Sequence, residues 1–194
     1  KGIRPVVAKK RVKELIAKVG LSKVANKKMK KLSGGMKRRA GIAQAMLNNP
    51  KILILDEPTA GLDPNERIRF RNLISELSED RLVLLSTHIV SDIEYIANEI
   101  LLMKDGKLMH KGTADEIINS MTETVWECFV EKNMVSDFMK KYKISNMKSE
   151  ADGVILRIIS HEKPFVNAQS VEASLEDVFL YYFGEKAGDE NAAI

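Results

Sequence analysis

Two adjacent acids, Asp56 and Glu57, directly follow the short apolar segment at residues 51–55. The continuous apolar pattern of that segment predicts a strand buried on both faces. Ligands of parallel α/β sheets bind beyond the carboxyl ends of the strands. There, Asp56 is suited to hold Mg²⁺, usually through water, and Glu57 is suited to orient and deprotonate an attacking water. Taken alone, the pair also fits a strand that ends in two acids before a turn.

A second segment with chemical promise is LSGG, residues 32–35. Ser33 and the glycines Gly34 and Gly35 open a predicted helix over residues 34–48. Free backbone N–H groups and a hydroxyl at the positive end of a helix dipole make an anion site. Glycines let a phosphate approach the backbone without interference from a Cβ atom. In isolation, the tetrapeptide is also consistent with a flexible capped loop.

Two further motifs follow in order along the chain. AGLDP, residues 60–64, contains Asp63, and STH, residues 86–88, ends the next predicted strand at His88. An imidazole at that strand end is positioned to bond a terminal phosphate, although a lone histidine at a strand end is often structural. His110 and His161 have no such companions, so we expect them on the surface.

The predicted elements alternate between strands and helices up to about residue 121, which implies a parallel sheet with helices on its faces. Beyond residue 121 we expect a small α+β appendage at residues 122–184 and a disordered polar tail at residues 185–194. The expected helices are 8–19, 34–48, 64–78, 89–97, 113–120, 133–142 and 174–184, and the expected strands are 51–55, 81–87, 99–104, 124–130 and 154–160.

The four motifs, in this order and spacing, resemble the nucleotide-binding domain of ATP-binding-cassette (ABC) proteins. LSGGM resembles the family signature, ILILDE the Walker B strand, AGLD the D-loop, and His88 the switch histidine. The resemblance covers about residues 1–118. The ending ASLEDVFLYYFG and the segment GGMKRR, with Met36 in place of the more usual Gln, resemble ATPases that serve ABC-2-type exporters.

The resemblance implies an α/β fold with a partial P-loop NTPase-like parallel sheet, and residues 1–121 as the C-terminal portion of the ATPase domain. It implies that Asp56 lies on the Mg²⁺ side, that Glu57 is the catalytic base, and that His88 contacts the γ-phosphate of ATP. The nucleotide bound by the opposite subunit of a head-to-tail dimer would be contacted by Ser33, Gly34 and Gly35. Asp63 would help to align the dimer interface.

A phosphate-binding loop of the pattern Gly-x-x-x-x-Gly-Lys-Ser/Thr does not occur in these residues. The one Gly-Lys pair, Gly106-Lys107, is followed by Leu108. In the family that loop lies upstream of the signature, so we expect this chain to be the C-terminal portion of a longer ATPase. Alone, it is expected to bind ATP poorly and to hydrolyse it negligibly.

The net charge of +4 conceals a division, because residues 1–39 hold 15 Lys and Arg residues against the single acid Glu14. We favour a solvated face over contact with anionic lipid. No aromatic residue lies within 1–39, so nucleic acid is not expected as a partner. Since no apolar run approaches the roughly 18 residues of a membrane span, transmembrane permease subunits would be separate chains. The expected location is the cytoplasmic face of a membrane, and the single cysteine, Cys128, fits a reducing compartment.

Three functions remain open on the sequence. The first is the energy-coupling ATPase subunit of a membrane exporter, which would co-purify with a polytopic membrane protein. The second is a non-transport ABC ATPase that acts on ribosomes or DNA. Salt-dependent binding of nucleic acid would favour this function. The third is a non-catalytic folding or interaction module in which residues 122–184 mediate dimer contacts.

Overall fold

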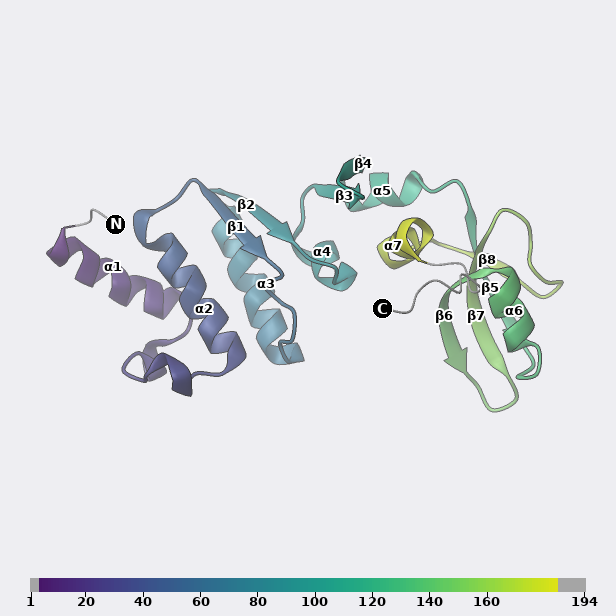
Figure 1. The fold of residues 1–194 in the computed structure, drawn as a ribbon, viewed down its shortest axis with the longest axis horizontal. Coiled ribbons are helices and arrows are strands. Elements are labelled where there is room, and N and C mark those ends of the chain that lie inside the picture. The colour runs from purple at the N-terminus through teal and green to yellow at the C-terminus, as the bar shows by residue number, and fades with distance from the viewer. Residues whose placement is uncertain (1–3, 185–194) are drawn as a thin grey trace. The chain divides into compact units, whose positions relative to one another are not determined.

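The structure is a computed structural model, and it describes residues 4–184 (Figure 1). The predicted disordered tail at residues 185–194 lies outside the described residues. The chain forms two compact units, the first ending at Ile96 and the second beginning at Ala97. The expected domain boundary after residue 121 stays a prediction, although the second compact unit begins before it.

Unit 1 places helices against a pair of parallel strands, as the α/β fold class predicts (Figure 1). Phe70, Leu73 and Leu77 of α3 supply the centre of its core. Its elements are α1 (Pro5–Lys18), η1 (Ser22–Val24), η2 (Met29–Lys31), α2 (Gly34–Ala45), η3 (Met46–Asn48), β1 (Ile52–Asp56), α3 (Pro64–Ser78), β2 (Leu82–Ser86) and α4 (Val90–Ile96).

Only one face of the β1–β2 pair is covered within the described residues. Leu53 of β1 is buried in the core beside Leu55 and Val83, whereas the alternate positions Ile54 and Leu84 are 70% and 48% exposed. The prediction of strands buried on both faces is therefore wrong for the described structure, because helices pack on one face alone. Asp56 and its register partner Ser86 end the uncovered face.

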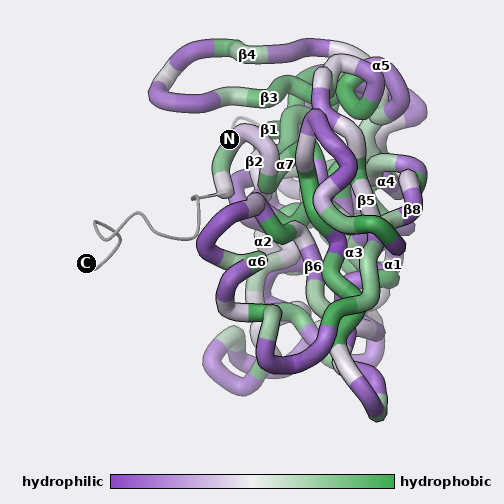
Figure 2. The backbone as a smooth tube through the Cα atoms, turned by 90° about the vertical axis from the view of Figure 1, so that its right-hand side faces the viewer, coloured by the Kyte–Doolittle hydropathy of each residue, from purple (hydrophilic) through white to green (hydrophobic). Residues whose placement is uncertain are grey.

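Unit 2 begins with a hairpin and continues into a four-stranded antiparallel sheet of order β6-β7-β5-β8. Asp105 and Gly106 turn the hairpin with positive φ angles of 50° and 73°, which a tight two-residue hairpin turn requires. In Figure 2 the hairpin alternates between hydrophobic and hydrophilic segments. The elements are β3 (Ile100–Lys104), β4 (Lys107–Gly112), α5 (Ala114–Asn119), β5 (Thr124–Val130), α6 (Val135–Lys141), β6 (Lys143–Ser149), β7 (Val154–Ser160), β8 (Gln169–Val171) and α7 (Leu175–Phe183).

Helix α7 joins the parts of unit 2 through polar contacts. The Arg157 guanidinium on β7 donates to the buried Asp177 carboxylate of α7 at 2.8–3.2 Å, and also to Glu127 on β5 at 3.1 Å. Lys104 on β3 donates to the Tyr182 carbonyl at 2.6 Å, and His110 on β4 bonds the Tyr182 hydroxyl at 2.5 Å. These contacts bind the hairpin and the sheet to the same helix, which explains why the second compact unit starts before β3.

Candidate functional site

The ends of β1 and β2 bring three of the predicted site residues together. The parallel register sets Asp56 beside Ser86, whose hydroxyl donates to the Asp56 carboxylate. The Glu57 backbone N–H donates to the Ser86 carbonyl at 3.0 Å, which extends the ladder by one residue. His88 then lies with its Nδ1 atom 2.8 Å from Glu57 Oε1. Two carboxylates and an imidazole therefore share one edge of the sheet.

Glu57 has a backbone and a side chain that are unusual for an ordinary turn residue. Its φ angle is +42°, in the left-handed region that costs a non-glycine residue on the order of 1–3 kcal/mol. Its Oε2 atom is buried and has no hydrogen-bond partner among the described residues. Buried carboxylate oxygens are normally bonded, so an orphaned one beside a histidine is suited to accept a proton or a hydrogen bond from a water.

Ser33 begins α2 as predicted. Its side chain caps the helix by accepting from the Met36 N–H at 3.2 Å, and the glycines Gly34 and Gly35 occupy the first turn. The backbone N–H groups of a first helical turn have no partner inside the helix. The local structure thus supplies the N–H groups and the hydroxyl that an anion would need.

Asp63 is connected to the signature helix through residues that sequence reasoning did not select. Asp63 caps α3 by accepting from the Glu66 N–H at 2.9 Å, and the Glu66 carboxylate pairs with Arg39 of α2 at 3.0 Å. A Cβ atom on Gly35 would lie 2.6 Å from Glu66 Oε2, so the Glu66 side chain packs directly against this glycine. The sequence carries no signal for the Arg39–Glu66 pair, because the contact depends on how α2 packs near α3.

Arg38 links the two groups of site residues. Its guanidinium donates at 3.0 Å to the carbonyl of Pro58, the residue after Glu57. The structure therefore joins Asp56, Glu57 and His88 in one cluster, and Gly35 and Asp63 around Glu66 in another, with Ser33 at the start of the same helix as Gly35.

The donor set suits the groups that the sequence predicts. Mg²⁺ is commonly bound through one or two carboxylates with water and phosphate oxygens completing its shell, and Asp56 is such a carboxylate. Among the described residues, no three or more His, Cys, Asp or Glu side chains are arranged to hold a metal ion between them, so Asp56 would hold the ion with few protein ligands. No described helix is long and apolar enough to cross a membrane.

Comparison with known proteins gives the family. Residues 4–60 match the family model described as ABC transporter. The uncharacterized ABC transporter ATP-binding protein YxlF of Bacillus subtilis strain 168 is 35% identical over 133 residues, which are 69% of this chain and 45% of that protein. The uncharacterized ABC transporter ATP-binding protein YhcH of the same organism is 31% identical over 194 residues, covering 92% of this chain and 62% of its own length.

A solved structure agrees with these matches. The structure of cbiO1 from Clostridium perfringens, described as part of the ABC transporter complex cbiONQ, superposes with a TM-score of 0.56 and 29% identity over 61% of this chain and 48% of that one. The chain spans 45% to 62% of the length of the two curated relatives. The sequence match over residues 4–60 and the shared fold together assign this part of the chain to an ABC transporter ATP-binding domain.

Proposed function

We propose that this chain is the C-terminal portion of an ABC transporter ATPase subunit, which couples ATP hydrolysis to export through separate transmembrane permease subunits. The observation that carries the proposal is the pairing of Glu57 with His88 at 2.8 Å beside Asp56, at the carboxyl ends of two parallel strands. Ligands of α/β sheets bind at that edge. The family assignment makes ATP the nucleotide.

Each residue of the cluster has a defined task in this proposal. The orphaned Oε2 atom of Glu57 accepts a proton from the attacking water. Asp56 would hold Mg²⁺, and the bound ion would supply positive charge against the phosphate oxygens. A neutral imidazole has a single N–H donor, so a neutral His88 donates either from Nδ1 to Glu57 or from Nε2 to the terminal phosphate. It donates to both groups only when its ring carries both protons.

The signature residues serve a second copy of the ATPase in this proposal. The Ser33 hydroxyl and the N–H groups of Gly34 and Gly35 lie at the open end of α2, and they would bind the nucleotide held by the opposite subunit of a head-to-tail dimer. Asp63 would align the interface, since it caps α3 beside the same glycine turn.

The uncovered apolar face of β1 and β2 supports the proposal that these residues are part of a longer ATPase. Ile52, Ile54, Leu82 and Leu84 are 48% to 70% exposed, which is unfavourable for four apolar side chains on one sheet face. An upstream segment that carries the phosphate-binding loop would cover this face and complete the site. Export and a cytoplasmic position rest on the resemblance of ASLEDVFLYYFG, which forms α7, to ATPases of ABC-2-type exporters.

The decisive experiment compares ATP turnover in this chain and in a version extended by its upstream sequence, each with and without Glu57→Gln. We expect negligible turnover by this chain and clear turnover by the extended protein. Glu57→Gln should lower that turnover by about 10²–10⁴-fold while ATP binding is kept, because the amide cannot take the proton. Glu79→Gln, on the exposed end of α3, is the matched control and should change nothing. Undiminished turnover in extended Glu57→Gln would refute the assigned role.

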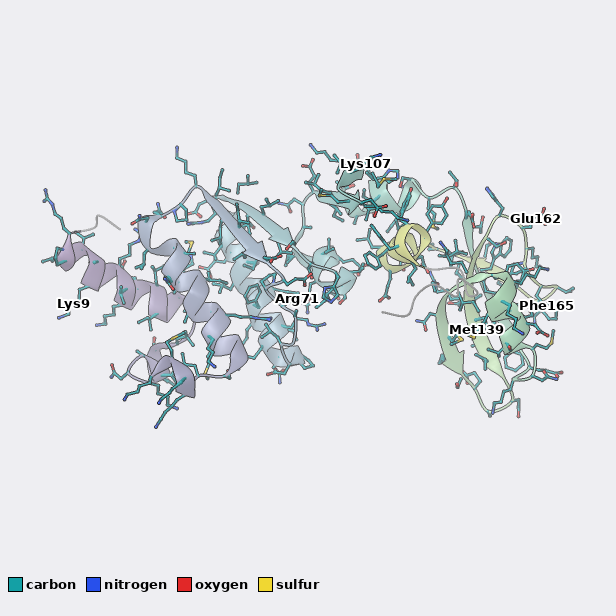
Figure 3. All side chains as sticks on the ribbon, viewed as in Figure 1. Lys9, Arg71, Lys107, Met139, Glu162 and Phe165 are labelled. Atoms are coloured by element: carbon teal, nitrogen blue, oxygen red, sulfur yellow. The ribbon has the colours of Figure 1, made fainter. Side chains whose placement is uncertain are left out.

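A nucleic-acid-directed ABC ATPase is the second candidate, favoured by the basic surface of unit 1. Every lysine between residues 4 and 39 is exposed, including Lys9 on α1 (Figure 3). Duplex RNA or DNA that binds with a steep salt dependence would favour this candidate. Absence of such binding at low salt, together with co-purification of a polytopic membrane protein, would favour the exporter subunit.

A further inference from the structure

Unit 2 contains a cavity that none of the ATPase residues line. Its volume is about 350 Å³, within the range of small-molecule sites. The end of α6, the start of β6, the end of β7 and the helix α7 form its walls, and Ile159 contributes apolar surface. The cavity is therefore built by several elements of one compact unit.

The lining of this cavity is strongly basic. It includes Lys140, Lys141 and Lys143 against one acid, Glu123, a balance of +2. Neither Lys140 nor Lys141 has an ion-pair partner among the residues that the structure describes. The positive charges of Lys140 and Lys141 at one cavity repel each other and are favoured by an anion beside them. The basic lining therefore favours an anionic ligand.

Two tyrosines contact two of the lysines that line the cavity. The Lys143 ammonium donates to the Tyr181 carbonyl at 2.8 Å and lies 5.7 Å from the ring of the same tyrosine. The Lys141 ammonium lies 5.0 Å from the centroid of the Tyr142 ring. Since both tyrosines and both lysines line the cavity, these contacts restrict the positive groups before any ligand arrives.

The remaining polar groups define the ligand further. Ser160 and His161 at the end of β7 add a hydroxyl and an imidazole, which donate well to phosphate oxygens. Glu123 is acceptor-only when ionised, so it suits a hydroxyl or amino group elsewhere on the same ligand. A ligand with a phosphate at one end and a hydrogen-bond donor at the other meets all of these groups.

We infer that this cavity is a binding site for a small organic phosphate, distinct from the ATPase chemistry of unit 1. Lys140, Lys141 and Lys143 bind the phosphate oxygens, and Glu123 accepts a hydrogen bond from the body of the ligand. The inference stands on unit 2 alone and does not depend on ATP hydrolysis. A free phosphate ester and a phospholipid headgroup share this chemistry, and the experiment separates them.

The test is a titration of the full chain with ribose 5-phosphate, followed by two-dimensional ¹H–¹⁵N NMR, beside ribose as the uncharged control. We expect saturable shifts confined to the residues that line the cavity, and none with ribose. The double variant Lys140→Glu/Lys141→Glu should weaken binding by at least about tenfold, because two attractive charges become repulsive. Lys107→Glu, at the exposed hairpin turn of the same unit (Figure 3), is the matched control and should bind normally.

Vesicles of phosphatidylcholine with phosphatidylglycerol form the second arm. Vesicle binding that the double variant loses, with no response to ribose 5-phosphate, would assign the phosphate to a lipid headgroup and still support the site. Shifts spread over lysines throughout the chain, or equal weakening by Lys107→Glu, would overturn it. No saturable response to either probe into the millimolar range would overturn it as well.

Discussion

Gly34 and Gly35 are neighbours in the signature segment, but the space around them differs. A Cβ atom on Gly34 meets nothing within 4 Å, whereas one on Gly35 would lie 2.6 Å from Glu66 Oε2 and 3.2 Å from two further atoms of that side chain. Glu66 is held there by Arg39, and both side chains are nearly buried. The second glycine therefore has a packing requirement that the first lacks.

Gly35→Ala should accordingly destabilise unit 1 by about 1–3 kcal/mol, because Glu66 must move and weaken its pair with Arg39. Gly34→Ala is the matched control, and the better helix propensity of alanine should leave stability unchanged or slightly raised. Urea unfolding followed by far-UV circular dichroism measures both. Equal effects of the two substitutions would show that the contact with Glu66 does not decide the choice of glycine.

Glu57 combines a chemical task with a strained backbone, so stability and activity should respond in opposite directions. Glu57→Gly removes the left-handed strain at φ +42° and should stabilise the chain by about 0.5–1 kcal/mol, while the extended ATPase loses turnover. Glu57→Gln keeps the strain and should leave stability unchanged. Thermal unfolding of both variants measures the difference, and a destabilised Glu57→Gly would show that the turn is not strained.

At the scale of the element, Asp63 begins α3 by accepting a hydrogen bond from the Glu66 N–H at 2.9 Å. Asp63→Ala should lower the stability of unit 1 by about 1 kcal/mol, whereas Asp63→Asn should keep most of it, since asparagine also caps well. Urea unfolding of both variants tests the cap. If Asp63→Asn keeps stability but weakens association of the extended ATPase into dimers, Asp63 has an interface role that is independent of the cap. Equal loss of stability in both variants would contradict the capping role.

Elements with local signals were predictable from the sequence. The predicted helix 64–78 matches α3, because the capping residue Asp63 and the following Pro64 determine where the helix starts. Ser33 marks the start of α2 in the same way. Strands β6 and β8 were not predicted, because KISNMKS contains two lysines and QSV is only three residues long. The strand conformation of β6 comes from its hairpin pairing with the following strand β7, and that of β8 comes from pairing with β5, which is far away in the sequence.

The candidate site likewise contains residues that the sequence predicts and contacts that depend on tertiary packing. Residue types and order pointed to Asp56, Glu57 and His88, and the structure places these residues in contact. The pair Arg39–Glu66 and the bond from Arg38 to Pro58 had no signal in sequence, because both depend on how α2 packs against its neighbours. The exposed face at Ile54 was mispredicted for a related reason, since an apolar pattern indicates which residues favour burial but not what covers them.

At the scale of the whole molecule, the two units can be observed separately. Trp126, the single tryptophan, lies on β5 of unit 2, where its indole N–H donates to the Ser160 carbonyl at 3.0 Å. Its fluorescence therefore reports the unfolding of unit 2, while far-UV circular dichroism reports both units. The polar centre of unit 2 is Asp177, which is 1% exposed and bonded to Arg157.

The charge on Asp177 should make the stability of unit 2 depend on pH. Burial alone would raise the pKa of Asp177, but hydrogen bonds from Arg157, Ser145 and Ser174 hold that pKa below its usual range. A carboxyl group whose pKa is lowered by folding stabilises the fold above its unfolded pKa, and this contribution is lost as pH falls through the folded pKa. Unit 2 should therefore weaken below about pH 4, within the range where unfolded Asp titrates.

Asp177→Asn tests the assignment directly. At pH 7 it should cost unit 2 about 3 kcal/mol, because Arg157 keeps its charge and loses a buried partner. The difference from wild type should shrink as pH falls through the folded pKa, since both side chains are then neutral. Glu127→Gln, which alters the 44% exposed partner of the same arginine, should cost about 1 kcal/mol or less. Urea unfolding followed by Trp126 fluorescence from pH 7 to pH 3 measures the stability of the wild type and of both variants. If the stability difference between Asp177→Asn and the wild type stays constant with pH, the loss of stability comes from packing rather than from charge.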